Sequence, residues 1–194
     1  MTVFVSARDA LLVVDVQRDF LPGGSLAVSH GDVVVPVLNR YLRLAQQKGL
    51  PIFASRDWHP DNHCSFRPQG GIWPVHCVAN TPGAAFATDL ELPARTVVID
   101  KAMQPEVEAY SAFSGSALDK LLSERGVERV LVGGLTTDYC VLNTVRDAVA
   151  AGFKVLLLTD AIRAVNVQPD DGARAVCEMQ SLGAIAVVIG DFAP

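Results

Sequence analysis

The sequence is poor in charge, in cysteine and in histidine, and each shortage excludes a class of protein. Only 19% of its 194 residues are charged while 50% are hydrophobic, a balance that excludes an intrinsically disordered chain. Four cysteines are too few for a small scaffold held together by disulfides. The net charge of −5 argues against a surface that binds nucleic acid or anionic membranes.

Long apolar runs are also missing. Runs such as residues 10–14 and 155–158 fall far short of the ~20 residues that a helix needs to cross a bilayer. The first residues lack the basic segment and long apolar stretch of a signal peptide. We therefore expect no membrane partner, a cytoplasmic location and reduced thiols. At roughly 150 residues per domain, the length predicts one domain over residues 1–194.

Three common functional motifs are absent. The chain has neither a phosphate-binding Gly-Lys-Ser/Thr loop nor a Gly-x-Gly-x-x-Gly segment after its first apolar run. It also lacks the Gly-x-Ser-x-Gly elbow that carries a nucleophilic serine. These absences argue against a nucleotide-binding enzyme or a serine hydrolase.

What the chain does have is a regular alternation of apolar runs and helical patterns. The apolar runs predict strands over residues 10–16, 51–55, 96–100, 129–133, 154–159 and 184–189. The helical patterns cover residues 33–48, 114–125, 137–151 and 169–182, with Ser114 as the expected cap of the second helix and Thr137 or Asp138 of the third. This alternation predicts a three-layer α/β/α sandwich with a six-stranded, mainly parallel sheet. The fold class suggests the strand order 3-2-1-4-5-6.

Polar residues follow several of these strands, where open α/β sheets bind their ligands. Asp15 ends the first strand, Lys101 follows the third, and Cys140 falls in the first turn of a predicted helix. A helix N-terminus favours a thiolate and offers N–H donors to an oxyanion. The alternatives are a capping aspartate, a solvated lysine and an inert buried thiol. The other three cysteines, Cys64, Cys77 and Cys177, are expected to be structural. Cys177 is expected on the apolar side of its helix.

A long segment over residues 56–93 is rich in Pro, Gly and His, and loops of this length are usually functional. It holds three of the four histidines, His59, His63 and His76, and Asp57 precedes them. Imidazole and carboxylate are suitable ligands for Zn²⁺, Fe²⁺ or Mn²⁺, so the loop predicts a site for one divalent metal ion. The alternative is a polar loop with scattered surface histidines, which is the role expected of His30.

Taken in order, these segments resemble the nicotinamidase/pyrazinamidase branch of the isochorismatase-like cysteine hydrolases. The resemblance covers nearly the whole chain and is carried by residues 14–20 (VDVQRDF), 23–26, 55–63 (SRDWHPDNH), 73–78 (WPVHCV), Lys101, 110–113 (YSAF) and 134–141. The metal-binding loop and the Trp-Pro-x-His-Cys segment narrow it to the nicotinamidases. One position departs from the family, which commonly has Gly after the lysine where this chain has Ala102.

The resemblance implies hydrolysis of nicotinamide to nicotinate and ammonia through a cysteine thioester, with pyrazinamide as a further substrate. Cys140 is then the nucleophile, Asp15 the base and Lys101 the cation that offsets the negative charges of the other two. The backbone N–H groups of Thr136 and Cys140 form the implied oxyanion hole, and the Leu135–Thr136 peptide is implied to be cis.

The same resemblance implies the ligand sets. The implied metal ligands are Asp57, His59 and His76, with His63 either in the ligand shell or next to it. The implied aromatic walls for the substrate ring are Phe20, Trp73 and Tyr110, for which ordinary core packing is the alternative. Two other functions stay open: another small-amide hydrolase of the superfamily, or a catalytically inactive relative that binds a metal or ligand. The only expected partner is a small amide, and the oligomeric state is left open, a homo-oligomer included.

Overall fold

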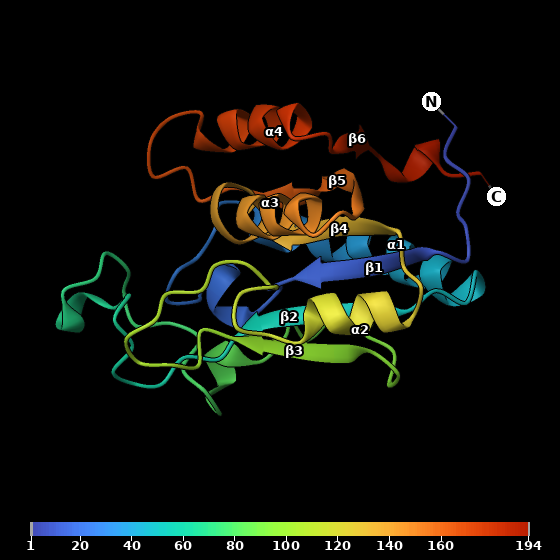
Figure 1. The fold of residues 1–194 in the computed structure, drawn as a ribbon. Helices are drawn as coiled ribbons and strands as arrows, with labels where there is room; N and C mark the ends of the chain where they lie inside the picture. Colours follow the sequence, from blue (N-terminus) through green and yellow to red (C-terminus); the bar gives the residue numbers. More distant parts are fainter. Residues whose placement is uncertain (1, 194) are drawn as a thin grey trace.

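A six-stranded parallel sheet runs through the middle of the molecule, and its helices cover both faces (Figure 1). The computed structural model describes residues 2–193. The strand order is β3-β2-β1-β4-β5-β6, which confirms the predicted fold class and order. The strands are β1 (Asp9–Val14), β2 (Ile52–Asp57), β3 (Val97–Lys101), β4 (Arg129–Leu135), β5 (Lys154–Arg163) and β6 (Ile185–Val187).

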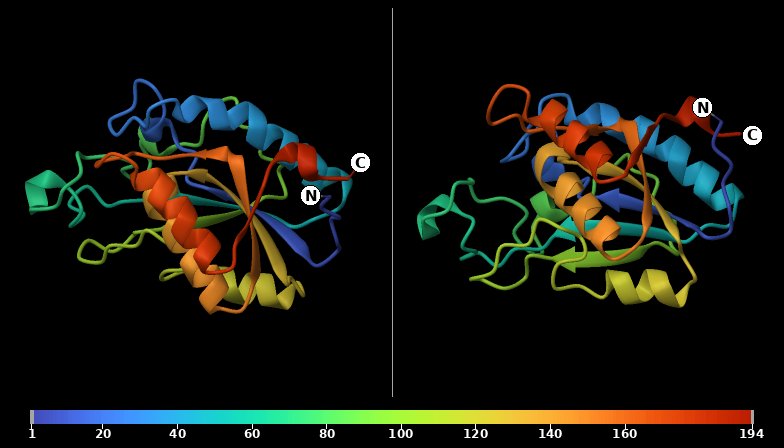
Figure 2. Two further views of the ribbon diagram at one scale, coloured as in Figure 1. Left: turned by 90° about the horizontal axis from the view of Figure 1, so that it is seen from above. Right: turned by 45° about the horizontal axis from the view of Figure 1, so that its top comes forward.

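The strands read as apolar runs because both faces of the sheet are buried. All six residues of β1 are buried, and neighbouring residues alternate between two hydrophobic clusters. Leu11 and Val13 pack with α1 (Val34–Gln47) on one face, whereas Leu12 and Val14 face the other helices. Figure 2 shows α1 alone on its side, opposite α2 (Leu118–Glu124), α3 (Leu142–Ala150) and α4 (Asp171–Ser181).

Most expected elements are present, and the differences lie at their ends. Helix α2 begins at Leu118, so the expected cap at Ser114 is wrong; the hydroxyl of Ser116 accepts the N–H of Leu118 instead. Strand β2 continues through Asp57, which moves the first two residues of the expected 56–93 loop into the sheet. Strand β6 keeps only three of its six expected residues.

One glycine fixes how closely the two central strands approach at the functional edge. Gly134 of β4 has a φ of 129°, and a Cβ built on it would lie 2.1 Å from the carbonyl oxygen of Val14 in β1. Only glycine has no Cβ to clash there. The close approach therefore brings the end of β4 beside the end of β1, where Asp15 follows.

The long connections gather at the carboxyl ends of the strands (Figure 1). The connection between β2 and β3 contains only short 3₁₀ turns, η3 (Arg67–Gln69) and η4 (Pro82–Ala84). At the opposite end, Val3 pairs with Phe192 and brings the two ends of the described chain together. None of the helices within residues 2–193 has the length and apolar character required to cross a membrane.

Candidate active site

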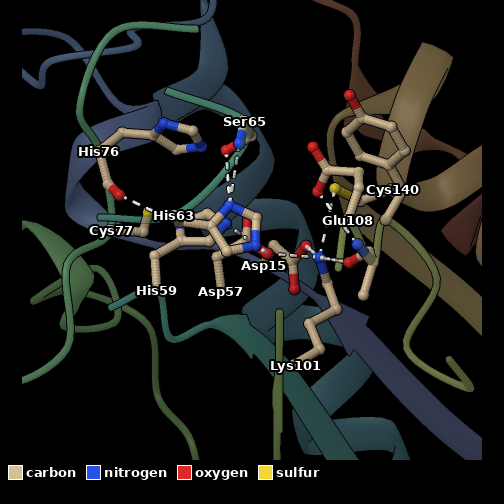
Figure 3. A network of polar contacts seen from close by, with 12 residues as sticks. Asp15, Asp57, His59, His63, Ser65, His76, Cys77, Lys101, Glu108 and Cys140 are labelled. Atoms are coloured by element: carbon tan, nitrogen blue, oxygen red, sulfur yellow. Dashed lines mark hydrogen bonds and ion pairs between the residues drawn. The ribbon is translucent and has the colours of Figure 1, made fainter. Parts of the chain in front are cut away.

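One buried ammonium group lies at the centre of the carboxyl-terminal edge of the sheet (Figure 3). The Nζ atom of Lys101 is 3.0 Å from Oδ2 of Asp15 and 2.5 Å from Oδ1 of Asp57. It also donates to the carbonyl oxygen of Ala109 at 3.1 Å and lies 3.6 Å from Sγ of Cys140. Lys101 is only 2% exposed, so water screens none of these contacts effectively.

Burial and charge act against each other on every group around this lysine. Burial by itself lowers the pKa of Lys101, but the charges of Asp15 and Asp57 outweigh it and hold that pKa well above its usual value. Burial also opposes ionisation of Asp57, and Lys101 still brings the pKa of Asp57 below its usual value. The ammonium ion and the Asp57 carboxylate are therefore the stable forms in the folded protein.

For Asp15 and Cys140, unlike Lys101 and Asp57, the pKa shifts favour the neutral form of the group. Burial raises the pKa of Asp15 to about 6 against the attraction of Lys101. Burial raises the pKa of the Cys140 thiol well above its usual value, and the negative charge of Asp15 adds to this while Lys101 opposes it. A proton on Cys140 and a carboxylate at Asp15 are thus the resting arrangement at neutral pH.

The backbone takes up the left-handed conformation at or directly after two of these residues, Asp15 and Lys101. Asp15 follows β1 with a φ of 47°, and its Oδ1 accepts the hydroxyl of Ser55 at 2.7 Å. Ala102 follows Lys101 with a φ of 54°, the left-handed region that favours glycine. The departure from the family pattern at this position therefore leaves the turn itself in place.

Cys140 lies in η5 (Thr137–Val141), a single π-helical turn between β4 and α3. The N–H of Val141 donates to the carbonyl oxygen of Thr136 at 3.0 Å, and the Leu135–Thr136 peptide is cis, as the resemblance implied. Single π turns inside helices occur frequently at functional sites. Sγ of Cys140 and carboxylate oxygens of Asp15 and Asp57 all lie within 4.8 Å of one another.

Beside this group, Asp57, His59 and His76 bring three possible metal-binding atoms within 4.8 Å of one another. Nδ1–H of His59 donates to the carbonyl oxygen of His76 at 3.1 Å, and Nδ1–H of His76 donates to that of Pro74 at 2.8 Å. The Nε2 atoms are left as acceptors. Burial lowers the pKa of His59 to about 4, so its imidazole is neutral, as a metal ligand must be.

His63 is placed differently from the other two histidines. Its Nε2–H donates to the carbonyl oxygen of Val107 at 3.1 Å, and its Nδ1 lies 2.8 Å from the hydroxyl of Ser65. Its ring lies against that of His59, tilted by 44°, with 4.4 Å between the centroids. The possible ligand atoms of His63 group with those of His59 and Glu108 rather than with that of Asp57.

A pocket opens over both groups and is walled by the three aromatic residues expected from the resemblance. Phe20 packs on His76 with 5.6 Å between ring centroids, and Nε1 of Trp73 donates to the hydroxyl of Tyr110 at 3.0 Å. The pocket is lined by Phe20, Leu26, Asp57, His59, Ser65, Trp73, His76, Glu108, Tyr110, Thr136, Tyr139, Cys140 and Val165. Cys140 and the group of Asp57, His59 and His76 therefore line the same pocket as the aromatic residues.

Comparison with known proteins identifies the family of this chain. The profile of the isochorismatase domain matches residues 9–188. This chain belongs to the isochorismatase family. It is 41% identical to the nicotinamidase of Escherichia coli, over 94% of this chain and 96% of that protein.

Two solved structures are also similar to this chain. The pyrazinamidase of Pyrococcus horikoshii in complex with zinc has a TM-score of 0.90 and 50% identity, over 94% of this chain and 99% of that one. PnC1 of L. infantum in complex with nicotinate has a TM-score of 0.92 and 35% identity, over 100% of this chain and 99% of that one.

Several residues around the site of this isochorismatase-family chain escape sequence reasoning. Gln17 holds the backbone of Asp57 through two hydrogen bonds of 2.8 Å, and its place in the 14–20 segment was the only signal. Glu108 and Val165 enter the pocket from loops far along the chain. Apolar periodicity gives no sign of such loop residues because only the tertiary fold brings them to the site.

Three other expectations are settled by the structure. All four cysteines are free, but Cys177 is exposed, so its expected place on an apolar face is wrong. Cys77 is buried and His30 is exposed, as expected. Neither Thr137 nor Asp138 caps a helix, because no side-chain cap bond forms at η5.

Asp138 instead ties the pocket wall to the turn that carries the thiol. Its two carboxylate oxygens accept the N–H groups of Val165 at 3.0 Å and Asn166 at 2.8 Å. We predict that Asp138→Ala lowers the free energy of unfolding by about 1.5–3 kcal/mol, the range for hydrogen bonds to a charged group. Chemical denaturation measures this loss, and hydrogen exchange should show lost protection at the Val165 and Asn166 amides.

Asp147→Ala on α3 is the matched control and should leave those two amides protected. Unchanged exchange at Val165 and Asn166 in the Asp138→Ala protein would show that the loop is held by other contacts.

Proposed function

We propose that this protein is a nicotinamidase, which hydrolyses nicotinamide to nicotinate and ammonia and accepts pyrazinamide as well. The observation that carries the proposal is the Lys101 ammonium, which joins Asp15 and Cys140 to the Asp57 group beneath one aromatic pocket. The nicotinamidase of E. coli and the nicotinate complex of the L. infantum protein support this choice of substrate.

In the first half of the proposed reaction, the carboxylate of Asp15 takes the proton of Cys140. The sulfur then forms a bond to the carboxamide carbon, and the carbonyl electron pair moves to oxygen, where the N–H groups of Thr136 and Cys140 stabilise it. Asp15 returns its proton to the nitrogen as the C–N bond breaks. Ammonia leaves, and the acyl group remains on Cys140 as a thioester.

In the second half, water replaces ammonia. Asp15 takes one proton from the water as the water oxygen attacks the thioester carbon. The C–S bond breaks to release nicotinic acid, which carries the second proton of the water and ionises to nicotinate in solution. The proton returns to the sulfur. Lys101 stays charged throughout, and its attraction limits the repulsion between the thiolate and the two neighbouring carboxylates.

The buried set of Asp57, His59 and His76 fits a divalent metal ion. The set offers one carboxylate and two neutral imidazoles whose Nδ1–H groups are already committed to backbone carbonyls, the usual way of orienting histidine ligands. A metal bound there supplies a Lewis-acidic position for the pyridine nitrogen of the substrate. Zinc fits this ligand set, and the zinc complex of the P. horikoshii pyrazinamidase supports a divalent metal.

The remaining parts of the proposal concern the organisation of the chain. We take residues 1–194 as a single domain whose β2–β3 connection supplies both metal ligands and pocket walls. A cytoplasmic location also belongs to the proposal, as does a small amide as the partner of the site.

The central test of the activity is ammonia release from nicotinamide by the purified, zinc-supplemented protein. We predict turnover by the wild type and a loss of at least ~1000-fold in Cys140→Ala, because no other group at the site is a comparable nucleophile. The exposed Cys177 gives the matched control, and Cys177→Ala should keep the wild-type rate. Absence of ammonia from the wild type would refute the function, and a fully active Cys140→Ala would refute the assigned nucleophile.

The metal is tested by zinc content and zinc affinity. We predict that His59→Ala loses the ion, while His63→Ala retains it with an affinity about 10- to 100-fold lower, as expected for a residue that supports a ligand. His30→Ala, at an exposed position, is the control and should bind zinc normally. Equal loss of zinc from the His59 and His63 variants would make His63 a direct ligand.

A further inference from the structure

The hydroxyl of Thr136 has no partner inside the protein. Among the described residues, three buried side-chain polar atoms accept or donate no hydrogen bond: Oδ2 of Asp15, Oγ1 of Thr96 and Oγ1 of Thr136. The Asp15 atom is explained by its ion pair with Lys101 at 3.0 Å. Of the two threonines, Thr136 lines the pocket and Thr96 does not. An unpaired buried hydroxyl costs stability, so its presence at a ligand site needs a reason.

The backbone of Thr136 is held in place where the residue lines the pocket. Thr136 is 3% exposed and follows the last residue of β4. Its carbonyl oxygen accepts the N–H groups of Tyr139 at 3.2 Å and Val141 at 3.0 Å, which fixes its backbone to the turn that carries Cys140. The residue cannot move away to find another partner without breaking that turn.

We propose that the Thr136 hydroxyl forms a hydrogen bond with the carboxamide group of the bound substrate. The inference rests on the proposed function, since attack by Cys140 requires the carboxamide to lie at this end of the pocket. Phe20 and His76, which pack on each other, line the same pocket and would contact the ring. A primary carboxamide offers both an acceptor oxygen and N–H donors, so it satisfies a hydroxyl that the protein leaves unpaired.

The test compares two ligands in a Cys140→Ala background, where binding is measured without turnover. Nicotinamide carries the carboxamide, and pyridine has the same ring nitrogen without it. We expect Thr136→Val to weaken nicotinamide binding by about 3- to 10-fold, the effect of one neutral hydrogen bond, and to leave pyridine binding unchanged. Thr136→Ser keeps the hydroxyl and should bind nicotinamide within about twofold of the parent protein.

Thermal unfolding of the ligand-free protein gives a second, independent readout. Thr136→Val should raise the melting temperature, because valine matches threonine in shape and removes an unpaired hydroxyl. Thr96→Val should raise it similarly and leave nicotinamide binding unchanged. Thr144→Val should lower it, because the buried Thr144 hydroxyl accepts the N–H of Ala112 at 3.0 Å.

Three results would overturn the inference. A lower melting temperature in Thr136→Val would mean that the hydroxyl has a partner in the free protein. Unchanged nicotinamide binding, or equal weakening for nicotinamide and pyridine, would show that the hydroxyl does not contact the carboxamide. If the wild-type protein releases no ammonia from nicotinamide, the proposed function fails and this inference fails with it. Turnover combined with any of the three results removes the inference alone.

Discussion

The site depends on one interaction, the burial of a single lysine ammonium between two carboxylates and a thiol. Each of these groups would be costly to bury alone, because a low-dielectric interior penalises an isolated charge. Together they compensate: Lys101 stays charged, Asp57 stays ionised and Asp15 is held close to the point at which it exchanges a proton. The loss of Lys101 would leave the buried carboxylates of Asp15 and Asp57 without their shared cation.

The same lysine also couples the two halves of the site. Asp57 contacts Lys101 through Oδ1 and belongs to the possible metal-binding set with His59 and His76. The thiol and the metal-binding group therefore share one carboxylate, and the positions of Asp15, Asp57, Lys101 and Cys140 depend on the register of β1, β2, β3 and β4. Because the parallel strands end at one edge, residues separated by more than 80 positions in the chain, such as Asp15 and Lys101, meet in a contact of 3.0 Å.

Much of this arrangement was predictable from the sequence because it follows from periodicity and strand ends. Apolar runs gave the strands, and Asp15 and Lys101 stood out as charged residues directly after such runs. The three clustered histidines indicated a metal site, although the sequence did not show that His63 turns toward Ser65 and Val107. The roles of Gln17, Asp138 and Val165 depend on contacts between segments that lie far apart in the chain. Local sequence patterns do not predict such contacts. The prediction that Cys177 lies on an apolar face was wrong for a related reason. The sequence shows which face of a helix is apolar, but the neighbouring elements decide how much of that face is covered.

The most direct test of the central claim is the pH dependence of Cys140 alkylation by iodoacetamide, followed peptide by peptide by mass spectrometry. The wild type should be compared with Lys101→Met and with Lys120→Met, a variant at an exposed lysine on α2. If Lys101 stabilises the thiolate, its removal from a protein that still folds shifts alkylation of Cys140 to higher pH, and Lys120→Met leaves it unchanged. The same alkylation profile in the wild type and Lys101→Met would contradict the account.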